Sequence, residues 1–324
     1  MTTTRRIVLA TLAAAALPAL APAALAQSDK NWPSKPIHFV TPYPPGGSSD
    51  TITRFVGDRV AKLLGQPVIV ENKPGAGATL GTAYAARLAP DGYNFFVGPT
   101  ATVAVAPYMK DVGYTYESFE PVAKLASSYG LITARKDAPF SDYKGMVAYA
   151  KAHPNKLTFA SNGVGSIVHM TAVLLHKDAG VQLTHVPYKG AAEAQTDLMA
   201  GRIDLMYDPV TAPRVKNGDL KGLATTSTVR NPQLPDIPTL KEQGFDMDSP
   251  SWFALFAPKG TPQPIVNRMA DAVKQALEMP GVKEQLQVSA LYPTYEDSAT
   301  FGKTLKRDVE ALRDVIQKEG LKTE

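Results

Sequence analysis

The chain has 324 residues, of which 44% are hydrophobic, and its formal net charge at pH 7 is +4. This length is enough for two domains that each bury a core. The small net charge gives no basis for a nucleic-acid partner, and the absence of cysteine excludes disulfides, thiolate metal sites and a lipid-modified N-terminal cysteine.

Residues 1–26 have the features of a secretory signal peptide. Arg5 and Arg6 precede an alanine-rich apolar run that ends with an A-x-A cleavage sequence, Ala24–Ala26. An uncleaved anchor helix is the alternative, but two prolines interrupt this weakly apolar run. We therefore expect a cleaved signal and a mature protein that begins at Gln27. The paired arginines also weakly resemble a twin-arginine signal, so both export routes stay open.

The first candidate site is the strand, loop and helix start within Phe39–Ile52. Glycines in the loop permit positive φ or close approach of a ligand, and an amphipathic helix follows that ends at Gly65. A helix N-terminus attracts anions, and this segment contains no Lys or Arg, so backbone dipoles and hydroxyls would bind the anion. A tight turn capped for stability by Ser48, Ser49 or Asp50 is an equal alternative. We assign Asp50 to capping, because its charge would repel an anion. The candidate contacts are Tyr43, Gly46, Gly47, Ser48 and Ser49.

The next connection has the glycine spacing G-x-G-x-x-x-G, formed by Gly75, Gly77 and Gly81. A dinucleotide-binding loop would also require an acidic residue at the end of the following strand to hold the ribose. That strand runs through Gly98 without an acid, which favours a second glycine-lined helix start. Thr100 follows, and we expect it at the floor of the same cleft, although a buried turn explains it nearly as well.

Short apolar runs alternate with helical patterns, which predicts an α/β fold with mostly parallel sheets. An extended segment from Phe119 to Arg135 crosses to a second lobe, and Trp252–Ala257 crosses back. We find no strand pattern after Pro258 and expect the remaining helices to return to the first lobe. The predicted domains are residues 27–130 with 251–324 for the first lobe, and 131–250 for the second.

The second lobe repeats the opening pattern of strand, glycine loop and serine-capped helix, again without Lys or Arg in the loop. His169 could donate to a ligand but more often such a residue packs locally. Tyr188 could form an aromatic lid or pack, and Asp208 could orient a ligand or cap the helix that starts at Pro209. We interpret His185 as structural. The candidate contacts are Ser161, Asn162, Gly165, Ser166, His169, Tyr188 and Asp208.

Catalytic signals are weak. The five histidines are scattered, and neither an H-E-x-x-H motif nor a G-x-S-x-G elbow is present. We therefore expect a binding protein without catalytic residues, cofactor or metal.

Several motifs in order resemble the Bug family, the extracytoplasmic solute receptors of tripartite tricarboxylate transporters. The motifs are Pro33–Ile37, Pro42–Asp50, Gly65–Gly77, Pro90–Tyr93, His185–Ala192 and Leu234–Thr239. The resemblance implies a type II periplasmic-binding-protein fold, two α/β lobes joined by two hinge crossings. It also implies a monomeric periplasmic receptor that closes over a carboxylate and delivers it to a membrane permease. The family's ligand loops correspond to Tyr43–Ser49 and Ser161–Ser166.

Two alternatives to a transport receptor remain. One is a secreted NAD(P)-dependent or hydrolytic enzyme that uses the loop of Gly75, Gly77 and Gly81, and the other is a receptor that feeds a sensor kinase. The sequence also leaves the carboxylate open among dicarboxylates, tricarboxylates and aromatic acids.

Overall fold

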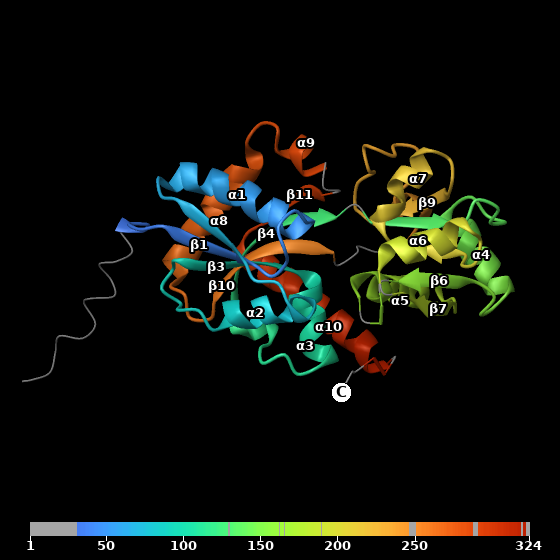
Figure 1. The fold of residues 1–324 in the computed structure, drawn as a ribbon, viewed down its shortest axis with the longest axis horizontal. Helices are drawn as coiled ribbons and strands as arrows, with labels where there is room; N and C mark the ends of the chain where they lie inside the picture. Colours follow the sequence, from blue (N-terminus) through green and yellow to red (C-terminus); the bar gives the residue numbers. More distant parts are fainter. Residues whose placement is uncertain are drawn as a thin grey trace, which may run out of the picture.

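The computed structural model of the protein describes residues 31–128, 130–161, 163–164, 166–188, 190–245, 251–287, 291–318 and 320–321. The predicted signal peptide, residues 1–26, lies outside the described residues, as do the candidate contacts Asn162 and Gly165. Figure 1 shows two lobes side by side, each built on a sheet covered by helices. The prediction of a two-lobed α/β fold is confirmed. The expectation of mostly parallel sheets is wrong, because both sheets also contain antiparallel strand pairs.

The first lobe contains a six-stranded sheet in the order β11-β4-β10-β3-β1-β2. Strand β1 pairs in parallel with β2 and β3, whereas β10 lies antiparallel between β3 and β4, and β11 pairs antiparallel with β4. The strands are β1 Ile37–Thr41, β2 Val68–Asn72, β3 Asn94–Pro99, β4 Phe119–Ser128, β10 Trp252–Pro258 and β11 Leu291–Glu296.

Side chains of this sheet alternate between two buried faces, as the period of a strand requires. Phe39 and Phe95 belong to one core cluster, while their neighbours Val40 and Phe96 belong to the other. Helices α1 Ser48–Leu64, α8 Gln263–Glu278 and α9 Val282–Gln287 contribute to the first cluster. Helices α2 Thr79–Ala86, α3 Ala106–Met109 and α10 Ser298–Lys318 contribute to the second, with a π-helical turn at Ala101–Val105.

The second lobe contains a five-stranded sheet in the order β7-β6-β8-β5-β9. Its central strands are again buried on both faces, because Leu205 and Met206 of β8 belong to different clusters. The strands are β5 Leu131–Ala134, β6 Thr158–Ser161, β7 Thr184–Pro187, β8 Leu205–Met206 and β9 Lys221–Thr225. The helices are α4 Tyr143–Ala152, α5 Ile167–Ala179, α6 Ala191–Met199 and α7 Ala212–Lys216.

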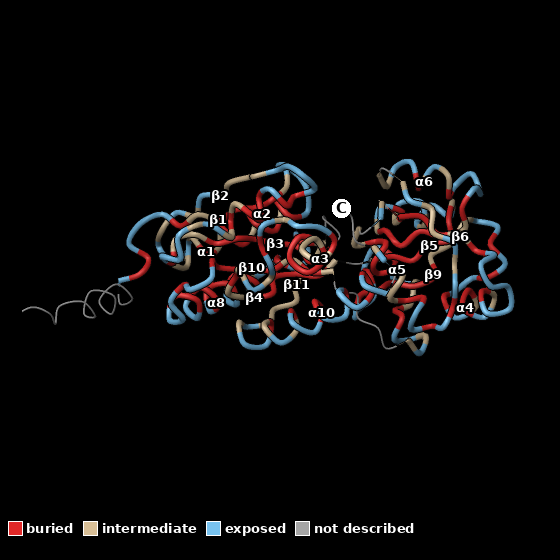
Figure 2. Tube along the Cα trace, turned by 90° about the horizontal axis from the view of Figure 1, so that it is seen from below, coloured by how far each residue is buried: buried red, intermediate tan, exposed pale blue. Residues whose placement is uncertain are grey.

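The chain passes between the lobes twice, as predicted. Strand β4 ends in the first sheet and β5 begins in the second, and β10 returns to the first. The crossings touch, because the Ser128 N–H donates to the Ser251 carbonyl at 3.2 Å and the two hydroxyls lie 2.7 Å apart. The lobes also meet directly, because Met170 of α5 is fully buried and belongs to the first-lobe cluster to which α10 contributes. Figure 2 shows buried segments in the interior of both lobes.

The prediction that no strand follows Pro258 is wrong. Strand β11 pairs with β4, placing Leu291 opposite Ser128. Its signal is weak because Pro293 interrupts the pattern, and proline is tolerated there since β11 forms the edge of the sheet. The expected return of the C-terminal helices to the first lobe is correct, because α8 and α10 belong to its two clusters.

Within the described residues, no helix combines the length and apolar character that crossing a lipid bilayer requires.

Candidate functional site

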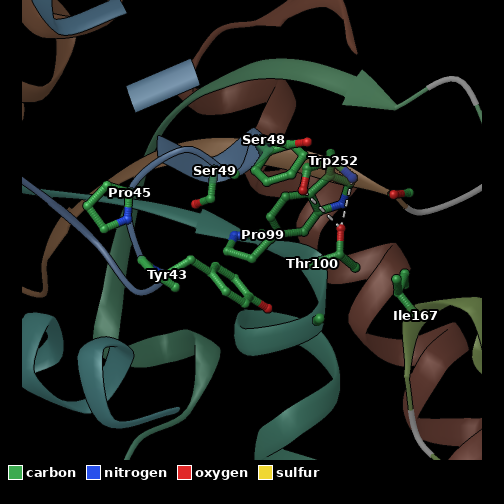
Figure 3. Close-up of a pocket in the computed structure, with 13 residues that line it drawn as sticks. Tyr43, Pro45, Ser48, Ser49, Pro99, Thr100, Ile167 and Trp252 are labelled. Atoms are coloured by element: carbon green, nitrogen blue, oxygen red, sulfur yellow. Dashed lines mark hydrogen bonds between the residues drawn. The ribbon is translucent and has the colours of Figure 1, made fainter. Parts of the chain in front are cut away.

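A cavity of about 400 Å³ lies where β1 and β3 end and β10 begins. This is the edge at which open α/β sheets bind ligands. The second lobe contributes Ile167 from the start of α5 (Figure 3). The described lining residues carry no formal charge: they are Tyr43, Pro44, Pro45, Gly47, Ser48, Ser49, Pro99, Thr100, Ala101, Ile167, Ser251, Trp252 and Phe253. We call this space the apolar cavity.

Helix α1 opens toward this cavity without a side-chain cap. Its N-cap residue is Gly47, and no side chain accepts a hydrogen bond at that position. The assignment of Asp50 to capping, and the alternative of a serine cap, are therefore wrong: Ser48, Ser49 and Asp50 all lie in the first turn. Ser49 there hydrogen-bonds to the Thr41 hydroxyl at 2.8 Å. An uncapped N-terminus directs N–H dipoles toward the cavity, which suits an anion.

Asp50 stabilises the loop from within the first turn of α1. Its carboxylate is 4% exposed and accepts a hydrogen bond from the Gly46 N–H at 2.9 Å. Arg54 forms an ion pair with it at 3.0 Å, and Asn72 Nδ2 donates to it at 2.9 Å. Burial alone would raise the pKa of Asp50, but these hydrogen bonds and the Arg54 charge outweigh burial and lower it. The carboxylate is thus held ionised and paired, beside the cavity but not in its lining.

Asn72 connects this carboxylate to the other end of the loop. The same amide nitrogen donates to the Tyr43 carbonyl at 2.9 Å, and the amide oxygen accepts from Arg54 at 2.9 Å. Because Asn72 ends β2, the adjacent strand positions the ligand loop. Sequence analysis did not identify this residue.

Thr100 and Trp252 form the floor of the apolar cavity (Figure 3). The Thr100 hydroxyl accepts from the Trp252 N–H at 3.0 Å and lies 3.3 Å from the Trp252 carbonyl, to which it donates. The Trp252 indole N–H donates to buried Asp308 of α10 at 2.9 Å. The polar groups of this floor are therefore paired within the protein.

Tyr43 lies between the apolar cavity and a second space of about 470 Å³, which we call the outer cavity. Ala101 and Ile167 also line both spaces, so the two are adjacent. Burial raises the pKa of the Tyr43 hydroxyl. Among the described residues this hydroxyl has no hydrogen-bond partner, so it can donate to a ligand.

Ser166 lines the outer cavity and caps α5. Its hydroxyl accepts from the His169 N–H at 3.2 Å, as the predicted helix start requires. Lys110, at the end of α3, is the one charged residue among the described residues that line this cavity.

His169 packs inside the second lobe. It is 4% exposed and stacks on His185 with ring centroids 3.9 Å apart. The Ser161 hydroxyl lies within hydrogen-bond distance of His185 Nε2, at 2.7 Å. Parallel pairing of β6 with β7 sets Phe159 opposite His185, which explains the cluster. The interpretation of His185 as structural fits these contacts.

Tyr188 and Asp208 have local partners instead of positions in either cavity lining. The Tyr188 hydroxyl donates to Asp197 at 2.8 Å, and Asp208 accepts from the Val210 N–H at 2.9 Å as an N-cap. The capping alternative for Asp208 is therefore found in the structure. A ligand role for these two residues and for His169 stays a prediction.

Groups of His, Asp or Glu that could hold a metal ion do not occur in the part of the chain that the structure describes. Sequence analysis missed the apolar half of the lining, above all Trp252, Phe253 and Pro99. Only the pairing of β10 with β3 brings these residues together.

Comparison with known proteins agrees with this geometry. The family described as "Tripartite tricarboxylate transporter family receptor" matches residues 52–321. The "UPF0065 protein in gbd 5'region" of Cupriavidus necator is 39% identical over 318 residues, which are 95% of this chain and 94% of that protein.

Two solved structures are similar over nearly their whole length. A TctC solute binding protein from Polaromonas, without ligand, has 31% identity and a TM-score of 0.79, covering 89% of this chain and 99% of that chain. The R. palustris protein Rpa4515, solved with adipate, has 28% identity and a TM-score of 0.70, covering 89% and 98%. These matches are to solute receptors and not to enzymes, which overturns the alternative of a secreted NAD(P)-dependent or hydrolytic enzyme.

We predict that Asn72→Ala loosens the loop that precedes α1. The Tyr43 carbonyl and the Asp50 carboxylate both lose a donor, which should lower the free energy of unfolding by about 1–3 kcal/mol. Hydrogen exchange should accelerate at the Gly46 amide, and denaturant unfolding gives the stability. The matched control is Asn94→Ala, since Asn94, at the start of β3, also donates to a carbonyl and a carboxylate, those of Ala89 and Asp91. Equal exchange at Gly46 in both variants would contradict the role of Asn72.

Stability should fall as the pH drops below about 6.5, the unfolded pKa of histidine. Burial, with a smaller contribution from His185, lowers the pKa of His169 to about 4, and burial lowers that of His176 to about 3. At pH values between these lowered pKa values and about 6.5, the unfolded chain binds more protons than the folded chain, so acid favours unfolding. We expect each of the two to contribute a loss on the order of 1–2 kcal/mol between pH 6.5 and pH 5.

Thermal melts of His176→Gln between pH 5 and pH 8 should show a flatter dependence on pH than wild type. His153→Gln, at an exposed helix end, is the control for the loss of a histidine outside the core. An unaltered slope in His176→Gln would show that this histidine does not cause the acid sensitivity.

Proposed function

We propose that this chain, which belongs to the tripartite tricarboxylate transporter receptor family and is therefore a solute-binding receptor, captures a small carboxylate between its lobes. In this proposal the receptor works in the periplasm, after cleavage of residues 1–26, and delivers the ligand to the membrane permease of such a transporter. The adipate bound by the R. palustris relative supports a carboxylate as the ligand.

The uncapped N-terminus of α1 at the cavity is the observation that carries the proposal. N–H dipoles and nearby hydroxyls can hold one carboxylate without a cation. The Tyr43 hydroxyl lies in the same lining and can donate a hydrogen bond. Ser166, at the start of α5, would add a contact from the second lobe when the lobes approach.

We further propose that the lobes, residues 27–130 with 251–324 and residues 131–250, rotate about the two crossings. Ser128 and Ser251 mark the point where the crossings touch, and extended segments can absorb such a rotation while each lobe stays rigid. Met170 keeps the lobes in contact during the motion, since its flexible side chain adapts to small shifts of α10.

The mature protein should bind a carboxylate at one site without converting it. Titration calorimetry against a panel of carboxylates should give saturable binding, and Ser49→Ala and Ser166→Ala should each weaken it by about 0.5–3 kcal/mol. Ser34→Ala is the control, because Ser34 is exposed and pairs with Tyr93 away from both cavities. Unchanged affinity in both site variants would contradict the two-loop site, and formation of a product would contradict the receptor function.

Ligand should close the lobes, because the closed form adds contacts from α5 and therefore binds more tightly. Small-angle scattering at saturating ligand should show a smaller radius of gyration than the free protein. The primary amide of the same ligand, which has no charge, is the control and should leave the curve unchanged. If a carboxylate is shown to saturate the protein and the radius of gyration does not change, the proposed rotation of the lobes is wrong.

A further inference from the structure

The apolar cavity has a wall formed by Trp252, Phe253 and prolines, and this wall offers a ligand almost no polar side-chain group. The Trp252 indole N–H is already paired with Asp308, and the Trp252 backbone is paired with Thr100. The cavity therefore meets the ring of Trp252 as an apolar surface. Phe253 and three prolines extend this surface: the prolines are Pro44, Pro45 and Pro99.

This wall is also rigid. Trp252 is 2% exposed, its backbone is held by Thr100 and by pairing with β4, and its ring is held by α10. A fixed aromatic and proline surface favours a flat apolar body, because such a body buries its faces without requiring the wall to rearrange.

A second carboxylate on the ligand would find no counter-charge in this cavity. The described lining residues are uncharged, and the nearby Arg54 is already paired with Asp50 and Asn72. An ionised group that loses its hydration without a partner is strongly disfavoured. Each carboxylate beyond the first therefore lowers affinity at this site.

We infer that the ligand is an aromatic monocarboxylate, whose carboxylate lies at the α1 N-terminus and whose ring lies against Trp252 and Phe253. This inference rests on the proposed function, since it assigns the class of carboxylate to the same site. It predicts that the chain prefers a different ligand class from its adipate-binding relative.

The competing arrangement is a dicarboxylate that extends into the outer cavity, where its second group would meet Lys110. The two spaces share Tyr43, Ala101 and Ile167, so such a ligand has a path. Lys110 is exposed, however, and an exposed ammonium attracts a carboxylate only weakly.

Two matched ligand pairs test the inference by titration calorimetry at pH 7. Benzoate and terephthalate differ by one carboxylate on the same ring, and hexanoate and adipate differ in the same way on the same chain. We expect benzoate to bind about tenfold or more tightly than terephthalate, and hexanoate more tightly than adipate. We also expect benzoate to bind more tightly than cyclohexanecarboxylate, which is apolar but not flat.

Two variants test which side chains cause the preference for an aromatic monocarboxylate. Phe253→Leu keeps an apolar side chain but removes the ring, so the preference for benzoate over cyclohexanecarboxylate should shrink several-fold. Lys110→Met should leave benzoate affinity unchanged. In a Trp32→Phe background Trp252 is the remaining tryptophan, and its fluorescence should change when benzoate binds.

The outcomes of these experiments distinguish a wrong ligand class from a wrong receptor function. Tighter binding of terephthalate than benzoate, with a loss in Lys110→Met, would overturn the ligand class and leave the carboxylate receptor intact. Binding of no carboxylate in the panel would overturn the proposed function and this inference together.

Discussion

The buried Asp50 carboxylate is the interaction on which the first ligand loop depends. It joins the loop, α1 and, through Asn72, the neighbouring strand β2. A carboxylate beside an anion site would normally oppose binding. Arg54 neutralises it, so the pair contributes almost no net charge while its hydrogen bonds define the shape of the loop. The dipole of α1 then remains the main attraction for an anion, and the loop needs no lysine or arginine in the cavity.

The start of α5 in the second lobe resembles the start of α1, but different interactions stabilise it. Ser166 caps α5 with its own side chain, and the loop before it is anchored through Ser161 to the stacked pair of His185 and His169. The same helix carries Met170 into the core of the first lobe. One element therefore carries the proposed ligand contact Ser166 at its N-terminus and a lobe contact one turn later. Any rotation of the second lobe must move both, which couples the position of Ser166 to the packing against α10.

The local pieces of this fold could be predicted from the sequence, and the pairings between distant segments could not. Strand β1, the glycine loop and α1 form one continuous segment, so spacing alone locates them. Trp252 enters the site only because β10 lies between β3 and β4, more than a hundred residues earlier in the chain. The edge strand β11 was hidden by Pro293. The prediction that Asp50 caps α1 is wrong because serine and aspartate residues at a helix start occupy the N-cap or the first turn with similar sequence patterns, and only geometry distinguishes the two positions.

The separation of polar and apolar groups around the cavity suggests how substitutions can change the ligand specificity of a receptor with this fold. In the proposed site the carboxylate of the ligand would bind to backbone N–H groups of α1, and substitutions of side chains hardly alter these groups. The wall depends on side chains from β10 and on the prolines that precede α1 and end β3. Because Asp308 and Thr100 pair the polar atoms of Trp252 inside the protein, replacing residues on the exposed part of the wall changes the shape and polarity of the cavity without unpairing a buried group. If the proposed carboxylate binds here, the groups that would recognise its charge are therefore separate from those that would select its body.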